Sequence, residues 1–254
     1  MHLTRLFSAT ILHRKVWFIW LLLGVLVPAA FPYLTPWEED RTIVEPARAQ
    51  AAWQMLWLAA MTWGLFQGAG FGEALSRQGL GEYLASQGTG KSSQLGQTWL
   101  ACLLWKLPML AAAVGICLFW ASPADPVESK AWFWLNLQYA ALFLMVFAAL
   151  LLLAIGLASR IGQAGGFFLA FGLAAYGLVG VKFLATFFDS EKGVLLETVW
   201  TFSPHYHLAD LTERLIFKSG NLPAGDFGNI SLYLAALLAV HLAVSWFCFT
   251  PRRP

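Results

Sequence analysis

Charged residues are scarce in this chain. Asp, Glu, Lys and Arg together make up 12% of its 254 residues, whereas 59% belong to the apolar and aromatic set AVILMFWYC. So few charges cannot cover the surface of a water-soluble domain of this length. The composition therefore excludes an ordinary soluble enzyme, and the abundance of apolar side chains excludes a disordered chain. The formal net charge is only +2, without the basic domain or tail that is typical of a nucleic-acid binder.

Cysteine is also scarce, and each of the three residues lies inside an apolar run: Cys102, Cys117 and Cys248. Their spacing matches neither a disulfide framework nor a metal site. What the chain has in excess is long apolar runs and aromatic side chains, including 13 Trp and 20 Phe. Such long runs are typical of helices that cross a membrane. The sequence therefore predicts an integral membrane protein.

A helix that crosses the hydrocarbon core needs about 20 mainly apolar residues. The chain contains six such stretches, and we predict that they form one all-α transmembrane domain over residues 1–254. Runs such as Ala140–Gly156 are apolar on every face, which favours helices surrounded by lipid or protein. The predicted spans are Val16–Pro32, Ala51–Phe71, Thr98–Trp120, Ala131–Ala158, Gly165–Phe188 and Ile230–Phe249.

The N-terminal residues have a pattern of their own. Apolar residues fall near one helical face of Met1–Lys15, which predicts a short interfacial helix that leads into the first span. A cleaved signal peptide is the alternative, because Pro28-Ala29-Ala30 ends that span, but five further spans favour retention. Basic residues are more frequent near span ends on the side of the N-terminus, which predicts that both termini are cytoplasmic. The apolar positions of the helix are Leu3, Leu6, Phe7 and Ile11.

The connection between the second and third spans, Gly72–Gln97, is longer than most of the others. Its polar residues alternate with leucines at three- and four-residue steps, which predicts short amphipathic helices along the cytoplasmic membrane face, broken at Gly88 and Gly90. Two interpretations stay open, a solvated connector and a binding surface for a soluble partner. Gly88–Ser93 is similar to the end of a phosphate loop, but Ala85 stands where that loop needs glycine. We therefore expect no nucleotide binding by this chain.

A second long connection, Asp189–Asn229, precedes the last span on the predicted outer side. An apolar piece too short to cross a bilayer is followed by Ser203 and Pro204, which together predict a capped helix start. Leu208–Phe217 is predicted to be an amphipathic helix. This order indicates a re-entrant segment, which is tolerated at membrane depth only where protein or a wet cavity surrounds its backbone.

His205 and His207 flank Tyr206 within this re-entrant segment. Two residues apart on a helix, the two imidazoles would point about 200° from each other, which does not suit a shared metal ion. We therefore predict hydrogen bonding at the interface for both histidines, and no metal site.

Lys106 is the basic residue that lies deepest in a predicted span. It is near the middle of Thr98–Trp120, two residues before Pro108, and a lysine at that depth is a functional candidate by default. Its long stem either reaches the cytoplasmic headgroups or makes a polar contact inside the bundle, and both alternatives stay open. No carboxylate lies deep in any predicted span, which argues against a carrier driven by protons or sodium ions.

The order of these features resembles the membrane subunit of an ABC transporter of the ABC-2 type, the permeases of type-2 exporters. The resemblance covers essentially the whole chain. It departs from the family pattern where the turn proline is absent and where glutamine replaces the lysine before the third span. The comparable residues are Glu73 with Arg77, Gly81-Glu82-Tyr83-Leu84, Gly88-Thr89-Gly90-Lys91, Gly96-Gln97, Ser203-Pro204-His205-Tyr206-His207-Leu208 and the basic stop Arg252-Arg253.

The resemblance implies that two copies of this chain, or one copy and a related permease, pair with two ATPase subunits beneath the inner membrane of a bacterium. ATP and Mg²⁺ would bind the ATPase, so this chain would hold no cofactor and no catalytic residue. It would export a hydrophobic or amphipathic substrate along a path at the subunit interface, lined by spans 1, 2 and 5. The residues that would couple it to the ATPase are Glu73, Arg77, Glu82, Tyr83, Leu84 and Lys91.

Two other functions compete with export. The same architecture suits a membrane anchor, or a mechanotransmission or regulatory subunit of an ABC-type complex that transports nothing. An intramembrane enzyme would need paired acids, a histidine cluster or a Ser–His pair at one depth, and the spans contain no such group. Co-purification with an ATPase separates the two ABC-type functions from the enzyme.

Overall fold

The computed structural model describes residues 2–30, 33, 41–187 and 193–250. Within these ranges the chain forms helices, turns and loops but no strand, which confirms the all-α prediction. The Arg252-Arg253 stop, the ends of Val16–Pro32 and Gly165–Phe188 and the start of Asp189–Asn229 lie outside the described residues. In chain order the helices are α1 (His2–Arg14), α2 (Val16–Ala30), α3 (Arg41–Ala59), the π-helix η2 (Ala60–Gly64), α4 (Leu65–Arg77), α5 (Leu80–Ser86), α6 (Lys91–Leu104), α7 (Leu107–Phe119), α8 (Pro126–Ala175), the π-helix η3 (Tyr176–Gly180), α9 (Val181–Phe187), α10 (Val194–Phe202), the 3₁₀-helix η4 (Tyr206–Ala209), α11 (Thr212–Ile216) and α12 (Ala224–Cys248).

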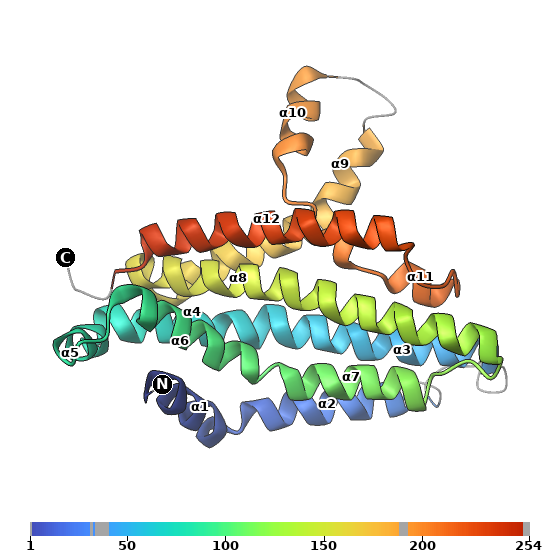
Figure 1. The fold of residues 1–254 in the computed structure, drawn as a ribbon, viewed down its shortest axis with the longest axis horizontal. Coiled ribbons are helices and arrows are strands. Elements are labelled where there is room, and N and C mark those ends of the chain that lie inside the picture. Colours follow the sequence, from blue (N-terminus) through green and yellow to red (C-terminus); the bar gives the residue numbers. More distant parts are fainter. Residues whose placement is uncertain (1, 31–32, 34–40, 188–192, 251–254) are drawn as a thin grey trace.

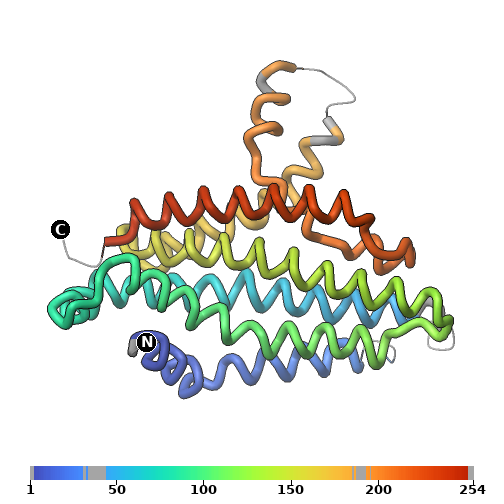
Figure 2. Tube along the Cα trace, viewed as in Figure 1, coloured from blue at the N-terminus to red at the C-terminus, as the bar shows by residue number. Residues whose placement is uncertain are grey.

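The longer helices lie side by side along one axis of the molecule (Figure 1). The first part of α8 runs through the bundle, with α4 and α12 packed along it. The N-terminal helix α1, the short helix α5 and the C-terminal end of α12 lie at the same end of the bundle, whereas α9 and α10 stand away from its side (Figure 2). The two ends of the bundle therefore differ in which connections they carry.

The core lies where α3 meets the first part of α8. Trp53 stacks on Tyr139, with ring centroids 3.9 Å apart, and its indole N–H donates to Asn136 Oδ1 at 2.9 Å. All three residues are buried. Because a buried polar group without a partner is costly, this hydrogen bond favours one register between the two helices.

α8 consists of two helical arms joined by a sharp turn. Gly162 has a φ of +88° and a ψ of 169°, a backbone conformation that favours glycine. Just beyond it, Gly166 packs directly on the backbone of Ala158. A straight helix would hold these two residues about 12 Å apart along its axis. The chain therefore reverses direction at Gly162.

Contacts further along the second arm show how far it returns. Ala175 lines the same cleft as Trp57, and the indole of Trp57 donates to the hydroxyl of Tyr139 in the first arm at 3.0 Å. In one straight helix Tyr139 and Ala175 would lie about 54 Å apart. The second arm thus folds back along the first, over the regions predicted as the spans Ala131–Ala158 and Gly165–Phe188.

The helices that are long and apolar enough to cross a membrane, among the described residues, are Lys91–Phe119, Pro126–Leu184 and Ala224–Cys248. The helices Leu3–Arg14 and Val16–Ala30, bent by 62° to each other, add a fourth candidate if the pair forms one span. The structure thus supports three or four long apolar helices where six spans were predicted. Pro126–Leu184 includes the predicted span Ala131–Ala158 and most of Gly165–Phe188. Ala51–Phe71 is helical, but glutamines and tryptophans lower its mean hydropathy.

The N-terminal helix forms as predicted, but its apolar face packs on protein. Phe7 stacks on Phe71 of α4 with ring centroids 4.0 Å apart, and Leu3 and Ile11 are also buried. Leu6, which the pattern assigned to the same face, is 47% exposed. One helical turn separates Leu3, Phe7 and Ile11, so these three residues alone form the packed stripe.

The segment before α12 differs from the prediction in two respects. Ser203 ends α10 and begins no helix, since its hydroxyl donates to the Val199 carbonyl at 2.6 Å. The predicted helix Leu208–Phe217 is interrupted between η4 and α11, because Asp210 Oδ1 accepts hydrogen bonds from the N–H and the hydroxyl of Thr212. Such side-chain bonding offers the backbone an alternative to a continuous helix.

Replacing Gly156 by alanine should destabilise the bundle. A Cβ at this position would lie 2.6 Å from Cα and 2.9 Å from the carbonyl oxygen of Ser245 in α12, and overpacking of this kind costs about 1–3 kcal/mol. The matched control is Gly115→Ala in α7, where a Cβ meets nothing within 4 Å. Thermal unfolding in detergent should give a lower midpoint temperature for G156A than for the unmodified protein, and an unchanged midpoint temperature for G115A. Equal midpoints for G156A and the unmodified protein would contradict this packing.

Candidate functional site

The residues predicted to couple to an ATPase gather at one end of the bundle, where α4 ends, α5 follows and α6 begins (Figure 1). Gly79, with a φ of +75°, makes the turn from α4 to α5, and Gly88, with a φ of +82°, makes the turn from α5 to α6. A short helix therefore forms within Gly72–Gln97, and it breaks at Gly88 as predicted. Of the coupling candidates, α5 contains Glu82, Tyr83 and Leu84.

Gln94 of α6 holds α5 in place. Its side-chain amide donates to the carbonyl oxygens of Gly81 at 3.0 Å and of Thr89 at 2.9 Å, and the side chain is fully buried. Two hydrogen bonds from one rotamer leave little freedom for the turn between the helices. We conclude that α5 is attached to α6 through a defined contact as well as through the chain.

The three coupling candidates of α5 differ in their exposure. Tyr83 is 63% exposed and Glu82 is exposed, whereas Leu84 is half-buried against the core. An exposed tyrosine beside an acid is the type of anchor that protein interfaces favour. The helix thus presents an aromatic and an acidic side chain on a fixed support.

The remaining coupling candidates, Glu73, Arg77 and Lys91, connect helices at the same end of the bundle. Glu73 and Arg77 form an ion pair at 3.5 Å within α4, and Arg77 also donates to the carbonyl of Arg160 in the turn of α8 at 3.3 Å. The amine of Lys91 lies 4.5 Å from the ring centroid of Trp246 in α12. The structure therefore joins the end of α4 to the turn of α8, and the start of α6 to α12, at the end of the bundle that carries α5.

Lys106 lies inside the bundle, at the break between α6 and α7, and is only 2% exposed. Its Nζ donates to the Ala59 carbonyl at 3.3 Å and lies 3.8 Å from the ring centroid of Trp63. Ala59 immediately precedes the π-helix η2, where the hydrogen-bond register of the backbone changes. Gly64 leaves room for the amine, since a Cβ there would lie 2.8 Å from Lys106 Cε. Of the two alternatives for this lysine, the structure has the polar contact inside the bundle.

An apolar cleft of about 370 Å³ lies between α3 with η2 and the second arm of α8 with η3. Met61 of η2 lines one wall and Leu178 and Val179 of η3 line the other. π-helical turns are frequent at functional sites, and pockets for small molecules have volumes of about 300–1,000 Å³. The polar side chains that border the cleft are Gln54, Asp210 and Thr212.

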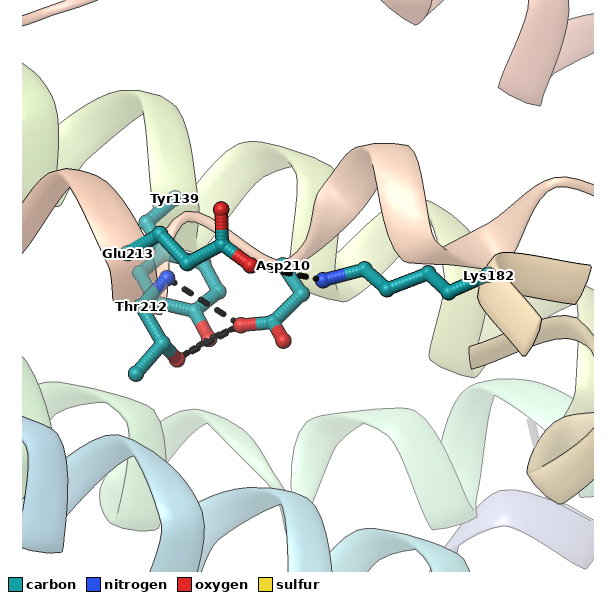
Figure 3. Close-up of polar contacts among 5 residues, drawn as sticks. All are labelled: Tyr139, Lys182, Asp210, Thr212 and Glu213. Carbon is teal, nitrogen blue, oxygen red and sulfur yellow. Dashed lines mark hydrogen bonds and ion pairs between the residues drawn. The ribbon is translucent and has the colours of Figure 1, made fainter. Parts of the chain in front are cut away.

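Asp210 stands at the centre of a hydrogen-bond cluster beside this cleft (Figure 3). Its Oδ1 accepts hydrogen bonds from the Tyr139 hydroxyl at 2.7 Å, from the Thr212 N–H at 3.1 Å and from the Thr212 hydroxyl. Tyr139 is fully buried and itself accepts the bond from the Trp57 indole. The cluster therefore connects three segments, α3, the first arm of α8 and the link between η4 and α11.

Sequence reasoning missed this cluster. Tyr139 lies roughly 12 Å inside the predicted span Ala131–Ala158 at the helical rise, and the fold brings Asp210 to it from a segment outside the spans. The prediction that no carboxylate lies deep considered only the span residues. The one local signal was the order Asp210-Leu211-Thr212, which is typical of a side-chain-capped turn but does not reveal what the turn packs against.

The re-entrant candidates are held by aromatic hydroxyl groups. The N–H of His205 donates to the Tyr233 hydroxyl at 2.9 Å, and the buried Tyr206 hydroxyl lies 2.8 Å from Nε2 of His241. The rings of His205 and His207 lie 5.4 Å apart, nearer than the predicted helix would place them, because this stretch is not α-helical. In the described part of the chain no three His, Cys, Asp or Glu residues lie together as metal ligands would.

Ser203 and Pro204 pack against the π-helix η3. The Ser203 hydroxyl bonds to the Tyr176 hydroxyl at 2.6 Å, and a Cβ at Gly177 would lie 2.6 Å from the Pro204 carbonyl oxygen and still nearer to the Tyr206 ring. The absence of a side chain at Gly177 therefore lets Tyr206 reach its buried position. The stretch from Ser203 to Ile216 packs on the bundle, whereas α10 stands away from it (Figure 1).

Comparison of the sequence with known protein families finds no match, and comparison with characterised proteins finds none either. The function is therefore argued from the geometry of the two regions above and from the resemblance of the motifs.

Replacing Lys106 by glutamate should destabilise the fold, whereas Lys106→Gln should retain it. A carboxylate cannot donate to the Ala59 carbonyl and would face the negative face of the Trp63 ring, with an expected cost of roughly 2 kcal/mol or more. The glutamine amide can still donate. Yield and thermal unfolding in detergent measure both variants, and a K106E protein as stable as K106Q would show that the amine contact does not support the bundle.

Proposed function

We propose that this chain is the membrane-spanning permease subunit of an ATP-driven ABC transporter of the ABC-2 type, which exports a hydrophobic or amphipathic substrate. The observation that carries the proposal is the helix α5, fixed by Gln94 between the ends of α4 and α6, with Glu82 and Tyr83 on its outer side. A soluble ATPase that moves a membrane protein needs a rigid contact surface on that protein, because a flexible loop would not transmit the force.

In this proposal the chain crosses the inner membrane of a bacterium six times. The spans are α2, then α3 with η2 and α4, then α6 with α7, the two arms of α8, and α12. α5 and both ends of the chain face the cytoplasm in this proposal, and the common position of α1, α5 and the C-terminal end of α12 at one end of the bundle supports this orientation (Figure 1). α1 lies along the membrane interface, and the stretch from Ser203 to Ile216 forms the re-entrant segment.

The helices α3, η2 and α4 follow one another without a gap from the cleft to α5. Met61 lines the cleft, and Arg77, at the end of α4, lies about 24 Å further along at the helical rise. Closure of the ATPase dimer on ATP would push α5, and the movement would reach the cleft as a rigid-body shift of this helical rod. The π-helix η2, braced by Lys106, is the point at which the rod can change register.

The proposal also divides the work between the subunits. ATP and Mg²⁺ bind the partner ATPase, and this chain holds no cofactor and performs no bond chemistry. A second copy of the chain, or a related permease, completes the transmembrane path, with two ATPase subunits beneath. The path lies at the interface of the two permeases and is lined by spans 1, 2 and 5, and the cleft between spans 2 and 5 supports that placement.

The alternative is a membrane anchor or mechanotransmission subunit that transports nothing. The apolar cleft of about 370 Å³ favours transport, because a subunit that only anchors a partner needs no such opening. ATP hydrolysis by the complex in liposomes distinguishes the two functions. Addition of the exported amphiphile should raise the rate of hydrolysis for a transporter and leave it unchanged for an anchor.

The double variant Glu82→Ala with Tyr83→Ala should lose the ATPase without unfolding the spans. Loss of an interfacial tyrosine and its acidic neighbour is expected to cost about 2 kcal/mol, roughly 30-fold in affinity. The measurement is the amount of ATPase that co-purifies when the permease is expressed together with the Walker-type ATPase subunit that the proposal requires.

The matched control is Val127→Ala with Glu128→Ala at the opposite end of the bundle, where Val127 is 77% exposed and Glu128 is also exposed. This control removes an acid and a large exposed side chain as well, and it should retain the ATPase. Undiminished co-purification of the E82A/Y83A protein would overturn the assignment of α5.

A further inference from the structure

The cleft has apolar walls and one charged border. Its apolar lining includes Trp57, Leu58, Met61, Phe171, Leu178 and Val179, and its one ionisable side chain is Asp210. An occupant that fits such a site has an apolar body and one polar end that complements a carboxylate. The nature of that polar end follows from the state of Asp210.

One oxygen of Asp210 is used and the other is available. All three hydrogen bonds from Tyr139 and Thr212 meet at Oδ1, and no described residue donates to Oδ2 (Figure 3). Oδ1 is thereby held at a defined position, so the orientation of the carboxylate is set by the protein before any ligand arrives. Pre-orientation of this kind lowers the entropy cost of binding.

The nearby cation is already paired. Lys182 of α9 forms an ion pair with Glu213 at 3.2 Å, and among the described residues no Lys, Arg or His forms an ion pair with Asp210. Neither Lys182 nor Glu213 lines the cleft, and the opposite charges of this pair offset each other. The remaining negative charge belongs to Asp210.

A cation suits this border better than other head groups. A carboxylate attracts a cation and repels an anion, and this attraction is stronger beside an apolar cleft than in bulk water. The indole of Trp57 is part of the same lining, and an aromatic face attracts a cation. Both effects act on an ammonium group and neither acts on an alcohol with comparable strength.

We infer that the cleft binds a single-chain amphiphile with a cationic ammonium head, which lies against Asp210, and an apolar tail, which lies between η2 and η3. This inference rests on the proposed function and names its substrate class. The tail position brings the ligand into contact with the two π-helices, so that a register change in either one alters the site.

The probe is dodecyltrimethylammonium, and its binding to the full chain in phosphatidylcholine nanodiscs is measured by the change in tryptophan fluorescence against empty discs. We expect Asp210→Asn to weaken the binding at least tenfold. The amide oxygen of asparagine still accepts the bonds from Tyr139 and Thr212, so the turn is retained. The matched control, Asp226→Asn, removes an exposed carboxylate of α12 that does not line the cleft and should leave the affinity unchanged.

A second arm tests the tail. Ala175 is an exposed residue of the cleft lining, and Ala175→Phe should weaken binding of both dodecyltrimethylammonium and the neutral comparator dodecanol. The unmodified protein should bind the cation at least tenfold more tightly than dodecanol. Equal affinities for the two probes, or no effect of Asp210→Asn in a folded protein, would overturn the inference.

A third arm separates a transported amphiphile from a resident lipid. Binding of the probe should be the same when phosphatidylethanolamine replaces part of the phosphatidylcholine, and its loss there would assign the cleft to a lipid head group and overturn the inference. The nanodisc experiments contain no ATPase. Failure of probe binding with normal ATPase co-purification would therefore refute the substrate class alone, whereas loss of co-purification in the unmodified protein would refute the proposed function.

Discussion

In apolar surroundings, each backbone N–H and C=O must form a hydrogen bond within the protein, and the structure depends on this requirement. Regular helices meet it by themselves, and the breaks between them need polar side chains. Gln138 bonds both the N–H and the C=O of Leu222 in the link before α12, and Arg160 donates to two carbonyls at the end of α12. Gln94 serves the turn after α5 and Lys106 serves the carbonyl before η2 in the same way. The scarce polar residues of this chain are therefore concentrated where the helices break.

In the proposed permease, we expect the bundle to move at these same breaks. Each one is held by a few hydrogen bonds between segments that are distant in the sequence, whereas the helices between them are close-packed and behave as rigid units. In the proposed permease, a force applied at α5 would be carried along α4 to η2, next to the cleft.

Several features follow from local properties of the sequence. Apolar length predicted helices that the structure has in all six predicted regions, and glycine predicted the turn at Gly88. The apolar pattern of Met1–Lys15 predicted the helix α1, although the face was expected to lie at the membrane interface and Leu3, Phe7 and Ile11 are instead buried against protein. Local patterns misassigned Ser203 and the helix Leu208–Phe217, because the hydrogen bonds that decide them compete with helix formation on nearly equal terms. The count of spans was not reproduced, since hydropathy alone does not distinguish Ala51–Phe71, packed within the bundle, from a helix that faces lipid.

Taken alone, the sequence established an all-α chain rich enough in apolar residues for a membrane, the short helix within Gly72–Gln97, and Lys106 as a residue that needs a partner. The tertiary structure determined which residues contact Lys106 and Asp210. That Lys106 meets Ala59, and that Asp210 meets Tyr139 beside an apolar cleft, depends on the reversal of α8 at Gly162 and on the close packing of glycine-containing helices. Helix formation is governed by neighbours within a few residues, whereas a buried polar group is satisfied by whichever distant segment the packing brings to it, so only the three-dimensional arrangement contains that information.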